Sequence, residues 1–268
     1  MDWLELKKLQ QTELGILRDF HKYCDENGLR YYLIGGALLG AARYGGFIPW
    51  DDDVDVAMPR EDYEKLKKTY NSEKYFLQNA ESEAPFARCV MKLRKNGTHI
   101  VEKNCQHIKI HDGIYIDIFP IDYVSDKSSP TLGKRAKLIR RLMTLRCIKS
   151  GYSGNHMAIK RLIRIALFWL PVKAIDKKID KLCTWENDGE RNWAVLFLHN
   201  YHWTKQIHNK VVFGDGAPIS FEGECFIGPA DTHAFLTRVF GEDYMKEPPR
   251  DKQKCPHSYL CVKYDSEA

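Results

Sequence analysis

The chain has 268 residues, 44% of them hydrophobic, which is enough apolar material for one large domain or two small ones. No run of about 18 or more apolar residues occurs, so the sequence predicts no membrane-spanning helix. The net charge of +5 is uneven: residues 134–181 hold 14 Lys and Arg against two acids (14 − 2 = +12), which leaves about −7 elsewhere. This asymmetry predicts an anionic partner for that segment and argues against a generally basic protein.

The N-terminal residues are charged and show no signal-peptide core, so the expected location is the cytoplasm. Eight cysteines are scattered without a CxxC pair, and we expect them to be reduced. Two histidine pairs, His107 with His111 and His199 with His202, have spacings that could hold zinc on a helix. No cysteine or carboxylate pair completes either set, and a closed zinc site needs four ligands, so structural zinc is not favoured.

The first half of the chain alternates predicted helices and strands. Apolar residues at helical spacing predict a helix over residues 2–26, which ends at Asn27-Gly28. Residues 29–36 are expected to form a strand and residues 37–43 a short helix. A further helix is predicted over residues 60–70, because Pro59 precedes it and acids lie in its first turn. We interpret the helices over residues 2–26 and 60–70 as scaffold.

Residues 51–55 carry four aspartates in five positions, interrupted by one valine. These carboxylates repel one another, and the simplest compensation is a hard divalent cation, which prefers oxygen ligands. If the segment enters a strand, Asp53 and Asp55 point to one face and are the predicted metal ligands. Asp51 is expected to support the metal site, and Asp52 should point away from Asp53. The alternative is a solvated acidic loop.

Gly35-Gly36 ends the preceding strand and opens the short helix. Glycine permits close backbone approach, and a helix N-terminus attracts anions, so the pair is a candidate phosphate cradle. Arg43 lies near the end of that helix and is a candidate phosphate ligand, because its planar fork matches phosphate oxygens. The competing readings are an ordinary turn for the glycines and a solvent-exposed position for Arg43.

Residues 75–123 are expected to form strands and turns. A hairpin is predicted over residues 88–103, because Asn96-Gly97 favours a tight turn. Before this turn, Lys92 and Arg94 share a strand face and are candidate ligands for nucleotide phosphates. Two solubilising charges on an outer face are the alternative interpretation.

The run of residues 113–122 is predicted as a strand with one carboxylate, Asp117, among apolar neighbours. Burying an unpaired carboxylate costs several kcal/mol, so Asp117 needs a partner. The metal site is the favoured partner, and a salt bridge to a Lys or Arg is the alternative.

The second half begins with a polar, turn-rich segment at residues 124–133. Residues 134–182 are predicted to form two or three basic helices, with Phe168 and Trp169 among their apolar residues. Such helices suit the surface of an anionic membrane, or they form a helical cap with basic residues in solvent. No nucleic-acid-binding motif accompanies them, so no nucleic acid is expected. A helix is also predicted to follow Asp231. Near the C-terminus, His257 is a candidate substrate contact, although a packed or solvated tail is the favoured reading.

The sequence GGALLGAARYGGFIPWDDDVDVAMPREDY resembles the signature of the LicD family, bacterial phosphocholine transferases related to the fukutin proteins. The resemblance is dense over residues 31–64 and weaker near residues 86–123 and 221–257. It implies an α+β, nucleotidyltransferase-like mixed sheet flanked by helices, with a basic helical C-terminal region. We divide the chain into a catalytic core (residues 1–123) and a helical, acceptor- or membrane-facing region (residues 124–268).

The resemblance also assigns roles to the site. Asp53 and Asp55 match its Asp-x-Asp, and Asp117 matches its later acid, so these residues would be catalytic and, with Asp51, hold Mg²⁺ or Mn²⁺. Lys92 and Arg94 match a basic hairpin of the family, which favours a role in phosphate binding. The implied reaction transfers phosphocholine, or a similar phospho-alcohol, from CDP-choline or another CDP-alcohol to a glycan hydroxyl and releases CMP.

The implied acceptor is a lipid-linked or polymeric precursor of a cell-surface glycan such as teichoic acid or lipopolysaccharide. Residues 134–181 would then contact the inner face of the cell membrane. Three alternatives remain open: a nucleotidyltransferase that uses an NTP, a metal-dependent DxD glycosyltransferase, and a non-enzymatic binder of membranes or glycans. Only the last of these predicts that replacing Asp53 and Asp55 leaves function intact.

Overall fold

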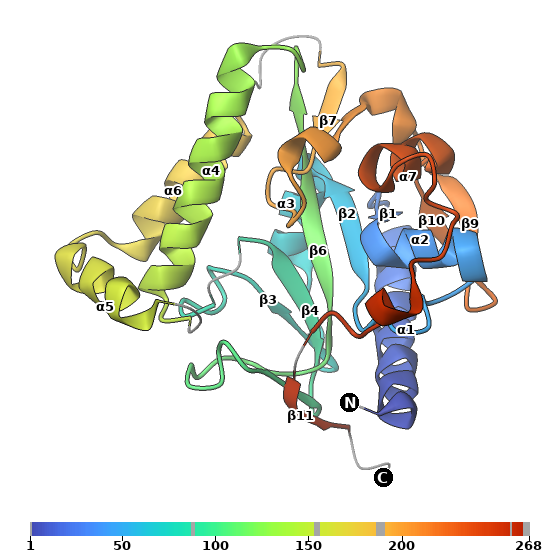
Figure 1. Cartoon of the computed structure of the whole chain (residues 1–268), viewed down its shortest axis with the longest axis horizontal. Coiled ribbons are helices and arrows are strands. Elements are labelled where there is room, and N and C mark those ends of the chain that lie inside the picture. The colour runs from blue at the N-terminus through green and yellow to red at the C-terminus, as the bar shows by residue number, and fades with distance from the viewer. Residues whose placement is uncertain (1, 87–88, 153–155, 186–190, 258, 265–268) are drawn as a thin grey trace.

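The computed structural model describes residues 2–86, 89–152, 156–185, 191–257 and 259–264 (Figure 1). It is an α+β fold in which helices surround a mixed β-sheet, as the sequence predicted. The helices are α1 (Trp3–Glu26), α2 (Gly35–Tyr44), α3 (Arg60–Thr69), α4 (Pro130–Lys149), α5 (Met157–Ala166), α6 (Val172–Cys183) and α7 (Thr232–Phe240). The strands are β1 (Tyr32–Leu33), β2 (Asp55–Pro59), β3 (Tyr75–Gln78), β4 (Met91–Lys95), β5 (His99–Glu102), β6 (Tyr115–Val124), β7 (Trp193–Val195), β8 (Ile207–Asn209), β9 (Ala217–Phe221), β10 (Glu224–Gly228) and β11 (Tyr259–Lys263).

Strand β6 organises the sheet because it pairs with three other strands. It lies parallel to β2 and antiparallel to β4 along its first half, and antiparallel to β7 along its second half. Strands β1, β3 and β8 extend the sheet from β2, β4 and β7 respectively. A parallel pair needs a long connection, and here residues between β2 and β6 supply it by forming α3, β3, β4 and β5.

The N-terminal helix packs an apolar stripe against the sheet. Asp2 caps α1 and accepts a hydrogen bond from Glu5 N, while Glu5 returns one to the backbone of Asp2. Leu9, Leu17 and Phe20 are fully buried at helical spacing and belong to the single large core cluster of the described chain. Helix α1 contacts β4 and β6, so it packs against the middle strands of the sheet.

The predicted hairpin over residues 88–103 is wrong. Strand β4 already has β3 on one edge and β6 on the other, so both of its hydrogen-bonding edges are occupied. The chain still turns after Lys95, where Thr98 Oγ1 donates to the Lys95 carbonyl oxygen. Strand β5 then leaves the main sheet and pairs antiparallel with β11 near the C-terminus.

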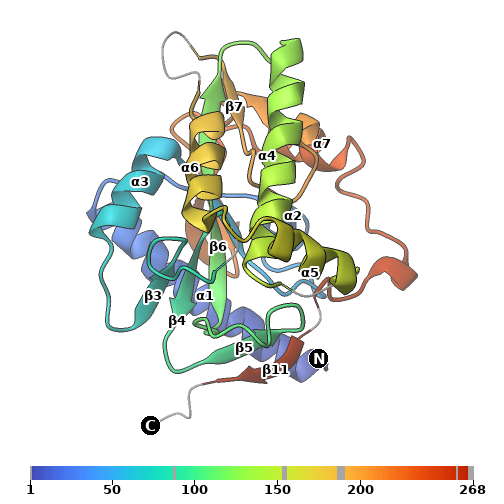
Figure 2. The same ribbon diagram turned by 90° about the vertical axis from the view of Figure 1, so that its left-hand side faces the viewer.

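The second half of the chain contributes both helices and strands. Helices α4 and α6 pack side by side, and α5 joins them at one end (Figures 1 and 2). Strands β7 and β8 join the main sheet, and β9 with β10 forms a hairpin beside α2. The helix predicted after Asp231 is α7, and the side chain of Asp231 caps it. The division after residue 123 stays a prediction.

Across the described residues, no helix combines the length and the apolar character needed to cross a lipid bilayer.

Candidate active site

The parallel pairing of β2 with β6 brings two distant carboxylates together. Asp55 and Asp117 are register partners, and Asp117 N donates to the Val54 carbonyl oxygen at 2.9 Å. The neighbouring residues Val56 and Ile118, also register partners, are fully buried. Burial of these apolar residues fixes the register, since a slip of one residue would turn every side chain to the other face.

The three aspartates before β2 form a compact cluster. Carboxylate oxygens of Asp51, Asp52 and Asp53 all lie within 4.8 Å of one another. The expectation that Asp52 points away from Asp53 is therefore wrong. Strand β2 begins only at Asp55, so strict alternation does not govern the residues that precede it. Burial still alternates, because Asp52 is buried while Asp51 and Asp53 are half-buried.

The crowded carboxylates oppose one another's ionisation. Burial raises the pKa of Asp51 to about 7, and the charges of Asp52 and Asp55 add to that effect. Burial also raises the pKa of Asp53 well above its usual range, with Asp55 and Asp51 as further causes. A hard cation among these oxygens would remove the repulsion.

Two glycines of α2 make room for the carboxylates. A Cβ atom at Gly36 would lie 2.2 Å from Asp51 Oδ2, and one at Gly35 would lie 2.8 Å from Asp55 Oδ2. Gly35 also has a φ of +58°, which favours glycine. Helix α2 begins at Gly35, so the positive end of its dipole faces the acids. The oxygens of Asp51, Asp52 and Asp53 thus lie close enough together to share a divalent cation, and Asp55 and Asp117 lie on the adjoining strands.

Lys92 on β4 is the basic residue nearest to Asp117. The two are register partners, and Lys92 Nζ lies 3.2 Å from Asp117 Oδ1 and 3.8 Å from Glu102 Oε1. The same ammonium lies 3.1 Å from the centroid of the Tyr115 ring. The salt-bridge alternative for Asp117 is thus present in the structure beside the acid cluster. Phosphate binding by Lys92 stays a prediction.

The two candidate arginines are engaged elsewhere. Arg94 lies buried over the same face of β4, where Nε donates to Gln78 Oε1 and Nη1 to the Gly113 carbonyl oxygen, at 2.5 and 2.6 Å. Arg43, in the last turn of α2, donates to the Lys246 carbonyl oxygen at 2.7 Å. The Arg94 contacts join β4 to its neighbours, and the Arg43 contact joins α2 to the C-terminal segment. The structure does not bring either guanidinium into contact with the acid cluster. Phosphate binding by these arginines stays a prediction.

The C-terminal segment closes onto the acid cluster. His257 Nδ1 lies 2.9 Å from Asp52 Oδ1 and 3.9 Å from Asp53 Oδ2. Cys255 Sγ donates to the second oxygen of Asp52 at 2.9 Å. The hydrogen bond to Asp52 raises the pKa of His257. The favoured reading of a packed tail agrees with this position, and contact with substrate stays a prediction.

His199 is a site residue that the sequence analysis missed. Its ring is buried against Phe119 and stacked on Tyr201, with Nε2 3.6 Å from Asp55 Oδ2. Tyr201 N donates to Nδ1 at 3.2 Å, and Nε2, on the side of the ring toward Asp55, is buried without a hydrogen-bond partner among the described residues. The sequence analysis paired His199 with His202 for zinc, but His202 bonds Thr204 instead.

Helix α1 also contributes two buried polar residues to the site. Gln10 Nε2 donates to the Asp51 carbonyl oxygen at 2.8 Å and supports the acidic loop. Glu13 is buried, and its pKa is raised by burial and by the charges of Asp53, Asp52 and Asp51. The sequence signal for these two residues is the presence of Gln and Glu within the apolar stripe of α1.

A pocket of about 150 Å³ opens beside Asp117. The C-terminal half of α4, including Arg140 and Cys147, also lines this pocket, as does Asn200. Arg140 Nη2 donates to the backbone oxygen of His199 at 2.7 Å, which ties α4 to the loop after β7. A substrate that reaches Asp117 would therefore contact α4.

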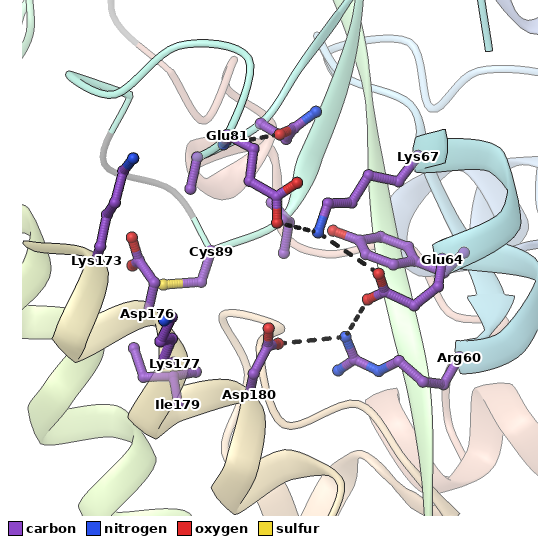
Figure 3. Close-up of a pocket in the computed structure, with 14 residues that line it drawn as sticks. Arg60, Glu64, Lys67, Glu81, Cys89, Lys173, Asp176, Lys177, Ile179 and Asp180 are labelled. Carbon is purple, nitrogen blue, oxygen red and sulfur yellow. Dashed lines mark hydrogen bonds and ion pairs between the residues drawn. The ribbon is translucent and has the colours of Figure 1, made fainter. Parts of the chain in front are cut away.

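A second pocket of about 200 Å³ lies between α3 and α6, away from the acid cluster (Figure 3). Its charged side chains pair among themselves: Arg60 lies 3.6 Å from Asp180, and Lys67 lies 2.7 Å from Glu81. Arg60 also donates two hydrogen bonds of 2.8 Å to the buried Asp122 on β6. These pairs join α3 to α6 and the sheet, so we interpret this pocket as structural.

Comparison with known proteins relates this geometry to a family. Residues 28–137 match the family model of the LicD/FKTN/FKRP nucleotidyltransferase domain. The chain is 29% identical over 265 residues to the lipopolysaccharide cholinephosphotransferase LicD of Haemophilus influenzae, which covers 96% of this chain and 97% of that protein. A stretch of 53 residues is 50% identical to the human ribitol 5-phosphate transferase FKRP, 18% of this chain and 11% of FKRP. Over 123 residues the chain is 30% identical to mannosyltransferase regulator 14 of Saccharomyces cerevisiae, 45% of this chain and 13% of that protein.

The matched range contains the glycine cradle (Gly35 and Gly36), the acid cluster and Lys92. Glu13, His199 and His257 lie outside it. The similarity to LicD extends over nearly the whole of both chains. Both findings agree with the motif order of Gly-Gly, Asp-x-Asp and a later acid on a neighbouring strand. The chain is therefore similar to the LicD/FKTN/FKRP family over residues 28–137, and to LicD over nearly its whole length.

Proposed function

We propose that this protein transfers phosphocholine, or a similar phospho-alcohol, from a CDP-alcohol to a hydroxyl of a cell-surface glycan precursor and releases CMP. The observation that carries the proposal is the register pairing of Asp55 with Asp117 beside Asp51, Asp53 and the glycine cradle. Two relatives support the reaction class, since one is named a cholinephosphotransferase and the other a ribitol 5-phosphate transferase. The chain is accordingly proposed to be a phosphotransferase.

The proposed cofactor is Mg²⁺, with Mn²⁺ as a substitute, held by Asp51, Asp53, Asp55 and Asp117. Bound there, the cation would offset the negative charge of the donor pyrophosphate and of the departing CMP. The N-terminus of α2 and the ammonium of Lys92 would attract the same phosphate oxygens.

Asp117 is proposed to act on the acceptor. The acceptor oxygen attacks the phosphorus of the phospho-alcohol, the bond between that phosphorus and the CMP oxygen breaks, and CMP leaves with the bonding electrons. The hydroxyl proton passes to Asp117, which borders the pocket beside α4. His199, whose Nε2 lies 3.6 Å from Asp55 Oδ2, would help to hold Asp55 in place.

The proposed acceptor is a lipid-linked or polymeric glycan precursor, in keeping with a relative whose name specifies lipopolysaccharide. The proposed location is the cytoplasm, with peripheral contact at the inner face of the membrane through residues 134–181. In this proposal residues 1–123 form the catalytic core, and residues 124–268 face the acceptor and the membrane.

A screen of donors tests the proposal directly. The purified chain is incubated with CDP-choline, CDP-ethanolamine, CDP-glycerol or CDP-ribitol, with Mg²⁺ or with EDTA, and CMP release is measured. We expect Mg²⁺-dependent release from one donor, its abolition in Asp53→Asn, and unchanged release in the control Asp25→Asn, an exposed acid of α1. Pyrophosphate release from an NTP, with no CMP from any donor, would instead identify a nucleotidyltransferase.

A further inference from the structure

Helix α5 exposes its apolar side. None of its residues is buried, and Ile159, Leu162 and Ile165 are 55%, 67% and 61% exposed. In a helix that covers a protein core, the apolar side faces the core and the charged side faces water. The arrangement in α5 is the opposite, so its apolar side requires a partner.

The turn after α5 extends the same apolar surface. Phe168 is 81% exposed and Trp169 is 65% exposed. Lys149, at the end of α4, donates from Nζ to the Phe168 carbonyl oxygen at 3.4 Å, which fixes the backbone of this turn. Figures 1 and 2 show α5 projecting from one end of the α4–α6 pair. We name the surface formed by Ile159, Leu162, Ile165, Phe168 and Trp169 the α5 face.

Basic residues flank the α5 face on its protein side. Lys160, Arg161 and Arg164 line a pocket between α5 and the end of α4, together with Ile148 and Tyr152. A helix lying flat in a bilayer interface has this distribution, because apolar side chains enter the acyl region while Lys and Arg reach the phosphate level. Large aromatic residues at the edge, such as Trp169, suit the same interface.

We infer that the α5 face inserts into the surface of an anionic lipid bilayer. The charge of the surrounding segment decides between a membrane and a second copy of the chain. Residues 134–181 carry a net charge of +12, so two copies packed through this face would repel each other. An anionic bilayer attracts the same segment and takes up the apolar side chains.

The α5 face also lies close to the candidate active site. Arg140 and Cys147 of α4 line the pocket beside Asp117, and α4 ends at Lys149, shortly before α5. Lys149 lies nine residues after Arg140, so the two are about 14 Å apart along the helix, at about 1.5 Å per residue. Insertion of the α5 face would therefore hold this pocket near the headgroups. Insertion would also place the pocket within reach of a lipid-linked acceptor, a consequence that rests on the proposed function.

Vesicle flotation tests the inference on the full chain. We expect binding to vesicles of phosphatidylglycerol and phosphatidylcholine, and weak binding to vesicles of phosphatidylcholine alone. The double variant Leu162→Glu/Ile165→Glu should lower the partition coefficient at least about ten-fold. The matched control is Val211→Glu, which alters an equally exposed apolar residue far from α5 and should bind as the wild type does. Circular dichroism confirms that each variant is folded.

Two further measurements distinguish membrane binding by the α5 face from the proposed transfer reaction. The Asp53→Asn variant should float with vesicles although it releases no CMP, and the α5 double variant should release CMP normally with a water-soluble acceptor. Absence of CMP release from any donor would defeat only the proposed reaction. Equal flotation of the double variant and the wild type would overturn the inference, as would a dimer that dissociates on Leu162→Glu/Ile165→Glu.

Discussion

Lys92 and Asp117 face each other from adjacent strands, with the lysine Nζ 3.2 Å from Asp117 Oδ1. Lys92 is buried, so removing its charge leaves Asp117 without its nearest counter-charge. We predict that Lys92→Met lowers the free energy of unfolding by about 3 kcal/mol, the usual cost of breaking a buried pair. The loss should shrink in saturating Mg²⁺, which would supply the missing positive charge. Urea unfolding with and without Mg²⁺ measures both values, and a loss of equal size in each would contradict a cation at Asp117.

Because of the acid cluster, we predict that the stability of the metal-free protein falls as the pH rises. Burial raises the pKa of Asp51 from 3.8 to about 7, and the pKa of Asp53 and of Glu13 is raised as well. The stability linked to Asp51 is therefore fully present below about pH 4 and is lost as the pH rises through about 7. The raised pKa of His257 acts in the same direction, because its charged form is stabilised by Asp52.

We thus expect the Tm in EDTA to fall between pH 5 and pH 8. In Mg²⁺ the fall should be smaller, because cation binding favours the ionised carboxylates. Thermal unfolding at several pH values tests this, and Asp51→Asn should flatten the EDTA profile. A Tm in EDTA that rises steadily to pH 8 in both proteins would show that the cluster does not govern stability.

The sequence predicted the strand positions of Asp55 and Asp117 because alternation of apolar residues reports a strand face locally. It could not predict that Lys92 pairs with Asp117, since register between β4 and β6 depends on the whole sheet. The hairpin prediction failed for the same reason: a favourable Asn96-Gly97 turn cannot show that both edges of β4 are already occupied. His199 was missed because its site contact arises from tertiary packing.

A substitution at Gly36 tests the glycine cradle, and Gly15 provides an internal control. A Cβ atom there would meet Asp51 Oδ2 at 2.2 Å, whereas one at Gly15 of α1 would meet nothing within 4 Å. We predict that Gly36→Ala displaces Asp51 and raises the Mg²⁺ concentration for half-maximal activity at least about ten-fold. Gly15→Ala should leave this value unchanged and stabilise the helix by up to about 1 kcal/mol. Mg²⁺ titration of CMP release compares them, and equal Mg²⁺ requirements would refute a role for the cradle.

His199 should act through Asp55 and not through substrate. Its Nδ1 accepts from Tyr201 N, and its Nε2 lies 3.6 Å from Asp55 Oδ2. We predict that His199→Phe weakens Mg²⁺ binding by about 10- to 100-fold, because an unsupported carboxylate holds a metal less well. His199→Gln, whose amide can donate along a similar direction, should recover part of the affinity, and His202→Phe should change nothing. Isothermal titration with Mg²⁺ measures binding without substrate. If His199→Phe binds Mg²⁺ normally but raises the KM for the donor, the histidine contacts substrate instead.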